Sequence, residues 1–400
     1  MLTFDHDILV SGGGVAGLAA AAVFGAAGFS VLCVDPTAPI TERDAEGSDL
    51  RTTAFLQPSQ SLLEQAGIWA RLKDHAAPLQ VMRIVDAGGV VAEPRLVKNF
   101  NAADISEKPF GWTLPNWLLR RELLARLTEL PNVEFRPGVG TTSLFTRASE
   151  ARVGLSDGSR PRVRLVIAAD GRASPMREAA GINVKTTRYG QKALAFAVSH
   201  PIPHENVSTE IHRAGGPFTL VPLPDWQGLP SSAVVWMETG PEALRLAELP
   251  CDAFEEALNY RSCLLFGPLT LVSRRTVWPI ISQQAERMSS ERLALMAEAA
   301  HVVPPIGAQG LNMSLMDLKL LVDLAVSNPT ELGSRGMLDT YHRKRHGEVT
   351  ARVTGIDLLN RASMAASQPM RDLRAKGLDA IYSLGPVRKT MMQLGLGARG

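Results

Sequence analysis

Three glycines near the N-terminus are spaced like residues that bind a phosphate group. Gly12, Gly14 and Gly17 form the pattern G-x-G-x-x-G between an apolar run and an alanine-rich stretch. In such a pattern the first glycine permits a tight turn, the second lets a pyrophosphate approach the backbone, and the third allows close helix–strand packing. Asp35 ends the next apolar run, where an acid accepts hydrogen bonds from the ribose of an adenosine. These residues predict a dinucleotide site and leave FAD and NAD as alternatives.

A second glycine turn lies near residue 308. The chain passes from a short apolar strand through Pro305, Gly307 and Gly310 into a helix expected to begin near Leu311. A turn that feeds a helix N-terminus presents unpaired backbone N–H groups, which favour negative charge. We therefore expect an anionic group at this turn.

A third segment, residues 165–182, reads as a strand, a turn and a capped helix. Asp170 and Gly171 follow the apolar run, Ser174 is a good N-cap, and Pro175 suits the first helical turn. Strand–turn–helix units of this kind are common, so the segment gains meaning only together with the two glycine turns.

Together the three segments resemble the FAD-dependent hydroxylases of ubiquinone biosynthesis, which are single-component flavoprotein aromatic monooxygenases with a para-hydroxybenzoate hydroxylase-like fold. The family motif D-G-x-x-S-x-x-R is matched by Asp170, Gly171, Ser174 and Arg177. The second FAD motif of the family is matched by Ala299, Ala300, His301, Pro304, Pro305, Gly307, Gly310 and Asn312. The resemblance extends to residues 51–69, 114–127, 216–225 and 341–364.

The resemblance implies an enzyme that hydroxylates the aromatic ring of a polyprenylated phenol. It implies FAD as the cofactor, NAD(P)H as the reductant, O₂ as the second substrate, and a flavin C4a-hydroperoxide as the hydroxylating species. A second Rossmann unit for NAD(P)H is not visible, and members of the family use the flavin cleft transiently. Two alternatives stay open: a non-catalytic or weakly flavin-binding subunit of a quinone-biosynthesis complex, and an FAD-dependent reductase of prenyl lipids.

The expected site residues fall into three groups. If the flavin ring lies over the second turn, the helix N-terminus stabilises the anion of the reduced flavin, so a catalytic role falls to Pro305, Gly307 and Gly310, and no side chain is assigned as acid or base. The cofactor-binding residues implied are Gly12, Gly14, Gly17, Asp35, Arg51, Arg120, Asp170, Gly171, Glu298, His301, Gly307, Ala308, Gln309, Gly310, Leu311 and Asn312. The candidates for lining a substrate pocket are Phe218, Trp236 and Trp278.

One pair of residues departs from the family pattern. Ala297 and Glu298 stand where the family has Gly-Asp. Glu298 keeps a carboxylate and is expected to replace the aspartate after a small shift of the turn. Ala297 is expected to avoid a positive φ, because a Cβ makes that conformation costly.

The elements that must position these residues predict an α/β fold. We expect a Rossmann-type FAD-binding domain, an inserted antiparallel-sheet substrate domain and a C-terminal helical region. The FAD-binding domain is assigned residues 1–78, 104–182 and 276–340. The substrate domain is assigned 79–103 and 183–275, and the helical region 341–400.

Composition limits the partners. A formal net charge of +2 and the lack of a basic cluster interleaved with aromatics argue against a nucleic-acid binder. Three widely spaced cysteines fit a reducing cytoplasm and no metal site. Residues 341–400 carry eleven Lys/Arg against four Asp/Glu. This basic end predicts a helical cap on the FAD domain, and for its last thirty residues peripheral contact with an anionic membrane, with a ubiquinone-biosynthesis complex as a further partner.

Overall fold

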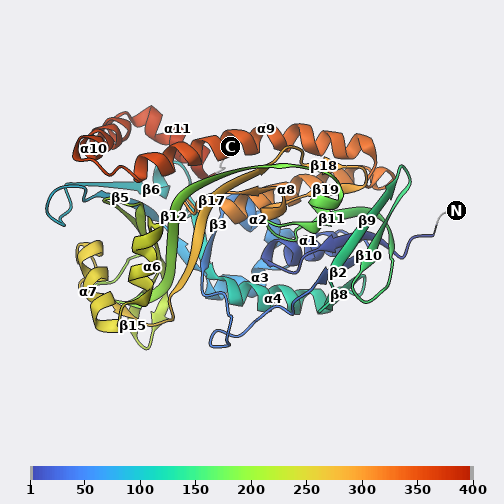
Figure 1. Cartoon of the computed structure of the whole chain (residues 1–400), viewed down its shortest axis with the longest axis horizontal. Coiled ribbons are helices and arrows are strands. Elements are labelled where there is room, and N and C mark those ends of the chain that lie inside the picture. The colour runs from blue at the N-terminus through green and yellow to red at the C-terminus, as the bar shows by residue number, and fades with distance from the viewer. Residues whose placement is uncertain (1–2, 397–400) are drawn as a thin grey trace.

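Two large sheets lie at opposite ends of the long axis of the molecule, as the computed structural model shows for residues 3–396 (Figure 1). The N-terminal sheet has eight strands, the second sheet has nine, and a small third sheet has three. The strand–turn–helix–strand unit predicted for the N-terminus is present as β1 (His6–Ser11), α1 (Val15–Ala26) and β2 (Val31–Asp35). This is the expected α/β architecture.

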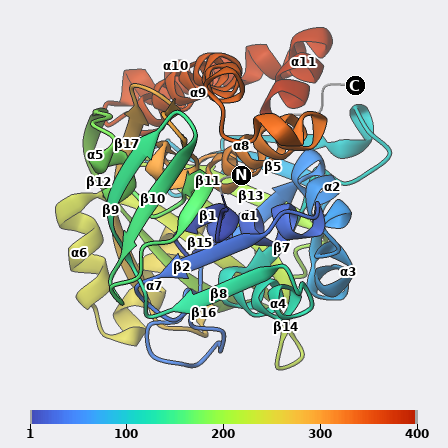
Figure 2. The ribbon, with the colours of Figure 1, turned by 90° about the vertical axis from the view of Figure 1, so that its right-hand side faces the viewer.

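The first sheet has a parallel core in the order β19-β11-β1-β2-β8. Its central strands are apolar and almost completely buried, as strands covered on both faces are. The turned view in Figure 2 shows the long β9–β10 hairpin extending from this sheet. The strands are β1 (His6–Ser11), β2 (Val31–Asp35), β8 (Val133–Pro137), β9 (Thr141–Arg147), β10 (Glu150–Leu155), β11 (Arg162–Ala168), β18 (Ser289–Ser290) and β19 (Leu293–Leu295).

The second sheet is antiparallel except for one parallel pair, β13 with β5. Its order is β20-β17-β12-β15-β14-β13-β5-β6, with β16 beside β12. The strands are β5 (Val81–Asp86), β6 (Leu96–Asn101), β12 (Val184–Ser199), β13 (Val207–His212), β14 (Pro217–Trp226), β15 (Leu229–Thr239), β16 (Thr270–Leu271), β17 (Thr276–Ala285) and β20 (His301–Val302). The third sheet contains β3 (Thr52–Leu56), β4 (Ala77–Leu79) and β7 (Gly111–Pro115).

One predicted domain boundary falls inside this second sheet. Residue 276 was expected to return the chain to the FAD-binding domain, but β17 pairs with β12 along most of its length. Both strands are long and run between the two ends of the molecule (Figure 1). β17 therefore carries this sheet to residue 285, and β20 adds residues 301–302 at its edge, so the expected boundary at 276 cuts through a strand of the sheet.

The helices cover the two sheets from different sides. Helices α1 and α8 pack against each other in the main core, whereas α6 and α7 cover the outer face of the second sheet. The helices are α1 (Val15–Ala26), α2 (Gln57–Gln65), α3 (Trp69–Leu72), α4 (Asn116–Thr128), α5 (Pro175–Ala179), α6 (Gly240–Glu248), α7 (Cys251–Ser262), α8 (Gln309–Ser327), α9 (Arg335–Ser363), α10 (Gln368–Ser383) and α11 (Gly385–Leu396).

The C-terminal helical region begins slightly earlier than expected, at Arg335. Figures 1 and 2 both place α9, α10 and α11 along one side of the molecule. Residues 397–400 of the predicted region lie outside the described residues. Across residues 3–396, every helix is either too short or too polar to cross a membrane.

Candidate functional site

The three motifs meet because they follow neighbouring parallel strands. The backbone N–H of Ala169 donates to the Ser11 carbonyl at 2.8 Å, and that of Met296 donates to the Ala168 carbonyl at 3.0 Å. Strands β1, β11 and β19 therefore end at one edge of the sheet. Ligands of open parallel sheets bind at this edge, beyond the carboxyl ends of the strands.

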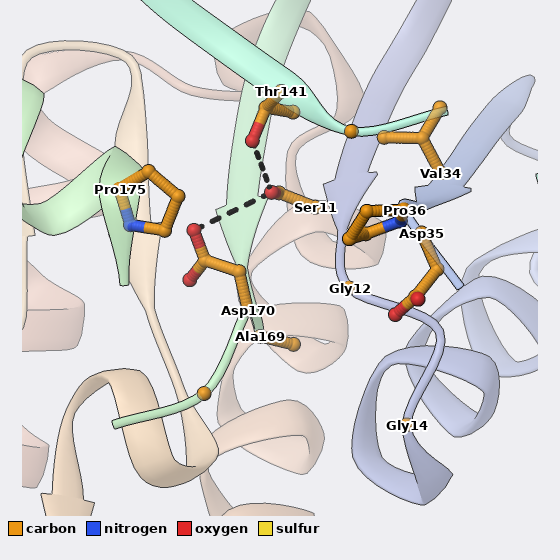
Figure 3. Close-up of a pocket in the computed structure, with 12 residues that line it drawn as sticks. Ser11, Gly12, Gly14, Val34, Asp35, Pro36, Thr141, Ala169, Asp170 and Pro175 are labelled. Carbon is orange, nitrogen blue, oxygen red and sulfur yellow. Dashed lines mark hydrogen bonds between the residues drawn. The ribbon is translucent and has the colours of Figure 1, made fainter. Parts of the chain in front are cut away.

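A cleft of about 460 Å³ opens at the first glycine turn (Figure 3). A Cβ on Gly12 would collide with the Ala169 carbonyl, and a Cβ on Gly17 would collide with the Gly12 carbonyl. A Cβ on Gly14 would meet no atom within 4 Å, because Gly14 faces the cleft. The turn thus needs two glycines for its own packing and leaves the third position open to a ligand.

The N-terminus of α1 offers free donors to this cleft. Its N-cap residue, Gly14, provides no side-chain cap, and the first turn contains no acidic residue. Asp35 lies at the same edge and accepts hydrogen bonds from the N–H groups of Gly13, at 2.6 Å, and Thr37, at 2.8 Å. A carboxylate has further lone pairs, so Asp35 can still accept from a hydroxyl group.

Asp170 extends from the end of β11 into the same cleft (Figure 3). Its Oδ2 accepts from the Met176 N–H at 3.1 Å and from the Ser11 hydroxyl at 3.4 Å. Its Oδ1 is buried and has no protein partner among the described residues. Burial raises the pKa of Asp170. An unpaired acceptor is costly to bury, so this oxygen indicates a ligand donor such as a hydroxyl group.

A second cleft of about 330 Å³ adjoins the first through consecutive residues, Gly171 and Arg172. Its lining residues include Asp49, Arg51, Arg120, Arg172 and Trp278. The arrangement brings three guanidinium groups and an indole ring to one opening.

Asp49 organises two of these arginines. Arg51 donates to it twice, Nε to Oδ1 at 2.8 Å and Nη2 to Oδ2 at 2.7 Å, and Arg120 Nη2 lies 3.6 Å from Oδ2. Burial alone would raise the pKa of Asp49, but bonding to Arg51 and Asn116 and the charge of Arg120 outweigh burial and lower it. Asp49 is therefore an anion that holds Arg51 and Arg120 in place, a role that sequence reasoning did not assign.

The second glycine turn is built from left-handed backbone and an uncapped helix. Gly307 and Ala308 have φ values of 64° and 55°, and α8 begins at Gln309 with no side-chain cap and no acid in its first turn. The N-terminus of α8 thus has free N–H groups like those of α1. Helix formation starts two residues before the expected Leu311.

Asn312 fastens this turn to β3 and α2. Its Oδ1 accepts from the Leu56 N–H at 2.9 Å and the Ser59 hydroxyl at 2.7 Å. Its Nδ2 donates to the carbonyls of Ala54 and Ala308, both at 2.7 Å. All the bonding capacity of the side chain is used internally, so Asn312 positions the turn rather than offering its amide to a ligand.

Gln309 has a similar structural task. Its Oε1 accepts from Arg352 Nη1 on α9 at 2.8 Å. Its Nε2 donates to the carbonyls of Gly307 and of Gly395 on α11, both at 2.8 Å. Gly310 carries no side chain and faces open space. The backbone of the turn, including Leu311, therefore remains the part available to a cofactor.

A buried ionic cluster supports the turn from the protein interior. His301 Nε2 lies 2.7 Å from Asp317 Oδ2, and Arg345 Nε donates to Asp317 Oδ1 at 2.8 Å. Burial raises the pKa of Asp317, but the charges and hydrogen bonds of His301 and Arg345 prevail and lower it. The His301 imidazole was expected beside the flavin, yet its side chain is completely buried and lines neither cleft. The sequence signal was Asp317, the one acid among the buried positions of α8.

Arg177 links the second and third motifs. Ser174 caps α5 as predicted, its hydroxyl accepting from the Arg177 N–H at 3.0 Å. The Arg177 side chain donates to the carbonyls of Ala299, at 2.8 Å, and Arg172, at 2.9 Å. Arg177 therefore holds the Asp170 turn and the Glu298 segment together.

The expectation for Ala297 was wrong. Ala297 has a φ of 55°, so the turn does use the left-handed conformation that glycine would adopt freely. The surrounding backbone imposes it, since Ala297 lies just beyond β19 and accepts a hydrogen bond from the Ala300 N–H at 2.9 Å. Glu298 is half-exposed, and its Oε2 accepts from Arg172 Nε at 3.2 Å at the rim of the second cleft.

Phe218 and Trp236 lie away from the site. They are opposite each other on β14 and β15, and both side chains pack into the core beneath α6 and α7. Side chains alternate between the faces of a strand, so Val221 and Val235 face the other way, toward the clusters of the first domain and the third sheet. Trp278 does lie at the second cleft, with the Arg51 guanidinium 5.4 Å from its ring.

Comparison with known proteins identifies relatives along nearly the whole chain. The family described as FAD binding domain matches residues 5–355. Ubiquinone hydroxylase UbiL of Rhodospirillum rubrum is 31% identical over 394 residues, covering 98% of this chain and 89% of that protein. The 3-demethoxyubiquinol 3-hydroxylase of Escherichia coli is 26% identical over 408 residues, covering 98% of both chains.

Solved structures share the fold. The p-nitrophenol 4-monooxygenase PnpA of Pseudomonas putida superimposes with a TM-score of 0.79 at 18% identity, covering 100% of both chains. PqsL of Pseudomonas aeruginosa, solved in complex with 2-aminobenzoylacetate, has a TM-score of 0.77 at 21% identity, covering 94% of this chain and 99% of that one. At such identities the likeness shows the architecture alone.

Proposed function

Since this chain belongs to the FAD binding domain family, among the FAD-dependent hydroxylases of ubiquinone biosynthesis, we propose that it hydroxylates the aromatic ring of a polyprenylated phenol. The balanced reaction takes the phenol, O₂, NAD(P)H and a proton to the hydroxylated phenol, water and NAD(P)⁺. One oxygen atom enters the ring and the other leaves as water, while NAD(P)H supplies two electrons.

The residues at the cleft fit FAD. The N–H groups of α1 and the open position at Gly14 suit a pyrophosphate. The unpaired Oδ1 of Asp170 and the remaining lone pairs of Asp35 suit hydroxyl groups of a ribose or ribityl chain. Arg51 and Arg120, held by Asp49, add positive charge beside the same cleft. The orphaned Asp170 oxygen is the observation that carries the assignment.

When bound, FAD supplies the hydride acceptance and oxygen activation that no side chain provides. The protein's own contribution is placement. The N–H groups at the start of α8 stabilise negative charge on a ligand lying over the second turn. Pro305, Gly307 and Gly310 shape that turn, and the Asn312 and Gln309 amides keep it rigid.

An apolar cluster beside the second turn is the part of the chain that we propose contacts the ring and tail of the substrate. Ala54, Leu56, Leu79, Phe110 and Met392 are among its buried members, and Ala308 of the turn packs against it. These side chains have no group that competes for the phenol, and they exclude water from the neighbourhood of the turn. Exclusion of water strengthens the electrostatic effect of the nearby N–H groups.

The test is spectroscopic and isotopic. Purified protein should be yellow with bound FAD, should oxidise NAD(P)H faster in the presence of a polyprenyl phenol, and should place ¹⁸O from ¹⁸O₂ in the ring. Colourless protein that cannot be reconstituted with FAD would instead indicate a non-catalytic subunit. Product formed without oxygen would indicate a prenyl-lipid reductase.

Two finer predictions about partners belong to the same proposal. Assembly with other proteins of ubiquinone biosynthesis would show as a complex larger than the isolated chain in extracts. Peripheral membrane contact by the basic C-terminal helices would place the enzyme where a polyprenyl substrate resides.

A further inference from the structure

Helix α10 is attached to the rest of the molecule mainly by polar contacts, together with one edge-to-face contact of Tyr382 with Phe100 of β6. None of its residues is buried. Arg374 Nη2 donates to Asp86 Oδ2 at 2.9 Å, and Arg95 Nη1 donates to Asp372 Oδ1 at 2.6 Å. Such contacts fix a position and contribute little hydrophobic stabilisation, so the outer surface of this helix is not committed to the protein core.

The outer surfaces of α10 and α11 carry apolar stripes. Met370 and Leu373 are three residues apart on α10, and Val387, Met391 and Leu394 follow the spacing four and three on α11. All five side chains are exposed, by 42% to 62%. Residues three and four apart lie on one face of a helix. Two consecutive helices thus each present an apolar face to solvent.

Positive charge accompanies these stripes. Residues 368–396 contain five Lys/Arg and two Asp/Glu. Lys376 is exposed, follows Leu373 by one turn of α10 and so flanks the α10 stripe, and it forms no ion pair with any residue between 3 and 396. Lys389 is also exposed, but it lies on the side of α11 away from the stripe. An amphipathic helix with cations beside its apolar face binds the surface of a bilayer that contains anionic lipids.

The opposite side of α11 reaches the proposed active site. Met392 is only 6% exposed and belongs to the apolar cluster with Leu56 and Phe110. The Gly395 carbonyl accepts from Gln309 Nε2, at the start of α8. One short helix therefore connects an exposed apolar stripe with the wall of the cluster beside the second turn.

We propose that the outer face of α10 and α11 rests on a bilayer containing anionic lipids, and that the prenyl tail enters the apolar cluster from the bilayer beside Met392. The docking follows from the stripes and charges alone, whereas the tail's route rests on the proposed function. In Figures 1 and 2 both helices lie on one side of the molecule with nothing outside them, as a docked surface requires.

The experiment is vesicle flotation of the full-length protein without turnover. Vesicles of phosphatidylcholine with about one-third phosphatidylglycerol should carry the protein to the top of the gradient, and pure phosphatidylcholine should carry much less. Met391→Glu/Leu394→Glu should abolish flotation, and Lys376→Glu should weaken binding about fivefold, since one cation near an anionic surface contributes about 1 kcal/mol. Lys389→Glu, on the side of α11 away from the stripe, should weaken binding less. The matched control is Leu229→Glu/Leu244→Glu, which changes two exposed leucines of the substrate domain and should float normally.

Turnover separates this proposal from the proposed function. The Met391/Leu394 variant should retain FAD and should oxidise NAD(P)H normally with a tail-less phenol in solution, yet should lose activity toward a long-tail phenol in vesicles. Equal flotation of this variant and the Leu229/Leu244 control would overturn the docking. Loss of a dimer mass in the variant, without change in flotation, would show that a second copy covers the face and would overturn it too. If the wild-type protein shows no activity toward the tail-less phenol, that result counts against the proposed function and leaves the membrane docking untouched.

Discussion

The two glycine turns of this protein do similar work by different means. The first turn is rigid because side chains are absent: Gly12 and Gly17 let backbone touch backbone. The second turn is rigid because polar side chains are buried around it, above all Asn312 and Asp317. Both end in a helix N-terminus without a cap, where N–H groups remain for an anion.

The two turns differ in how far along the chain the residues that shape them lie. Most of what shapes the first turn lies within residues 12–35, and the remote contributions are the Ala169–Asp170 backbone and the Phe135 ring. The second turn depends on Leu56, Arg345, Arg352 and Gly395, which are remote in the chain. The first turn is thus formed mainly by neighbouring residues, whereas the second can be destabilised by substitutions in several distant segments.

The largest effect should come from the buried cluster beneath the second turn. Replacing Asp317 with alanine removes the buried carboxylate that pairs with Arg345 and leaves this arginine with Glu348 and the Met313 carbonyl only. Breaking a buried pair costs about 3–5 kcal/mol of unfolding free energy. Chemical denaturation measures the loss. Asp323→Ala is the control, because Asp323 is exposed on the same helix and its pair with Lys319 is a surface pair.

The same residue predicts a pH dependence. The pKa of Asp317 is lowered in the folded protein, so its contribution is complete above the unfolded value of about 4 and is lost as pH falls through the lower folded value. Wild type and Asp317→Ala should therefore converge in stability in strong acid. A difference that stays constant from neutral pH to acid would show that the Asp317 carboxylate contributes by packing, not by charge.

The next largest effect is expected when a side chain is added at Gly14 or Gly310, the positions of the two turns that face open space. Gly14 has extended backbone, φ −69° and ψ 174°, so Gly14→Val should fold and yet fill the pyrophosphate space. Hydrogen bonds to a charged group are worth about 1.5–3 kcal/mol each, so FAD affinity should fall by roughly a hundredfold or more. Gly310→Val should weaken FAD affinity less, since the adenosine end is still held, while turnover falls strongly. Fluorescence titration of apoprotein and steady-state rates measure both.

Gly355→Val is the control for these valine variants. Gly355 lies on the exposed face of α9, and a Cβ at this position would meet no atom within 4 Å. Its FAD affinity and turnover should equal those of the wild type. Full retention of flavin by Gly14→Val would contradict the assignment of the first turn.

A smaller effect is expected at Glu298. If this carboxylate replaces the family aspartate, Glu298→Ala should reduce FAD affinity by about tenfold, the loss of one hydrogen bond. Thermal stability should hardly change, because the pair with Arg172 is half-exposed. Glu298→Asp should keep most of the affinity. Unchanged FAD binding in the alanine variant would show that Glu298 serves only Arg172.

The smallest effect is a gain. Ala297→Gly should stabilise the fold by about 0.5–1 kcal/mol, because relief of a left-handed alanine is worth about 1–2 kcal/mol and the added backbone entropy costs about 0.5–1 kcal/mol. Ala299→Gly, at a position without positive φ, should lose stability instead. Thermal melts of the two variants decide whether Ala297 stores strain.

The sequence by itself determined the parts whose reasons are local. The first turn with Asp35, the Ser174 cap and the uncapped start of α8 follow from residue types and spacing within a short stretch of chain, as does the parallel pairing of β1 with β2. The tertiary structure decided which face each strand presents and which polar residues meet. Phe218 and Trp236 point into the core because pairing fixes the face of β14 and β15, and Ala297 takes a glycine conformation because its neighbours impose it. Asp49, Arg177 and Asp317 gain their roles only when separate elements pack against one another, since charges in a low-dielectric interior act on whatever the fold places beside them.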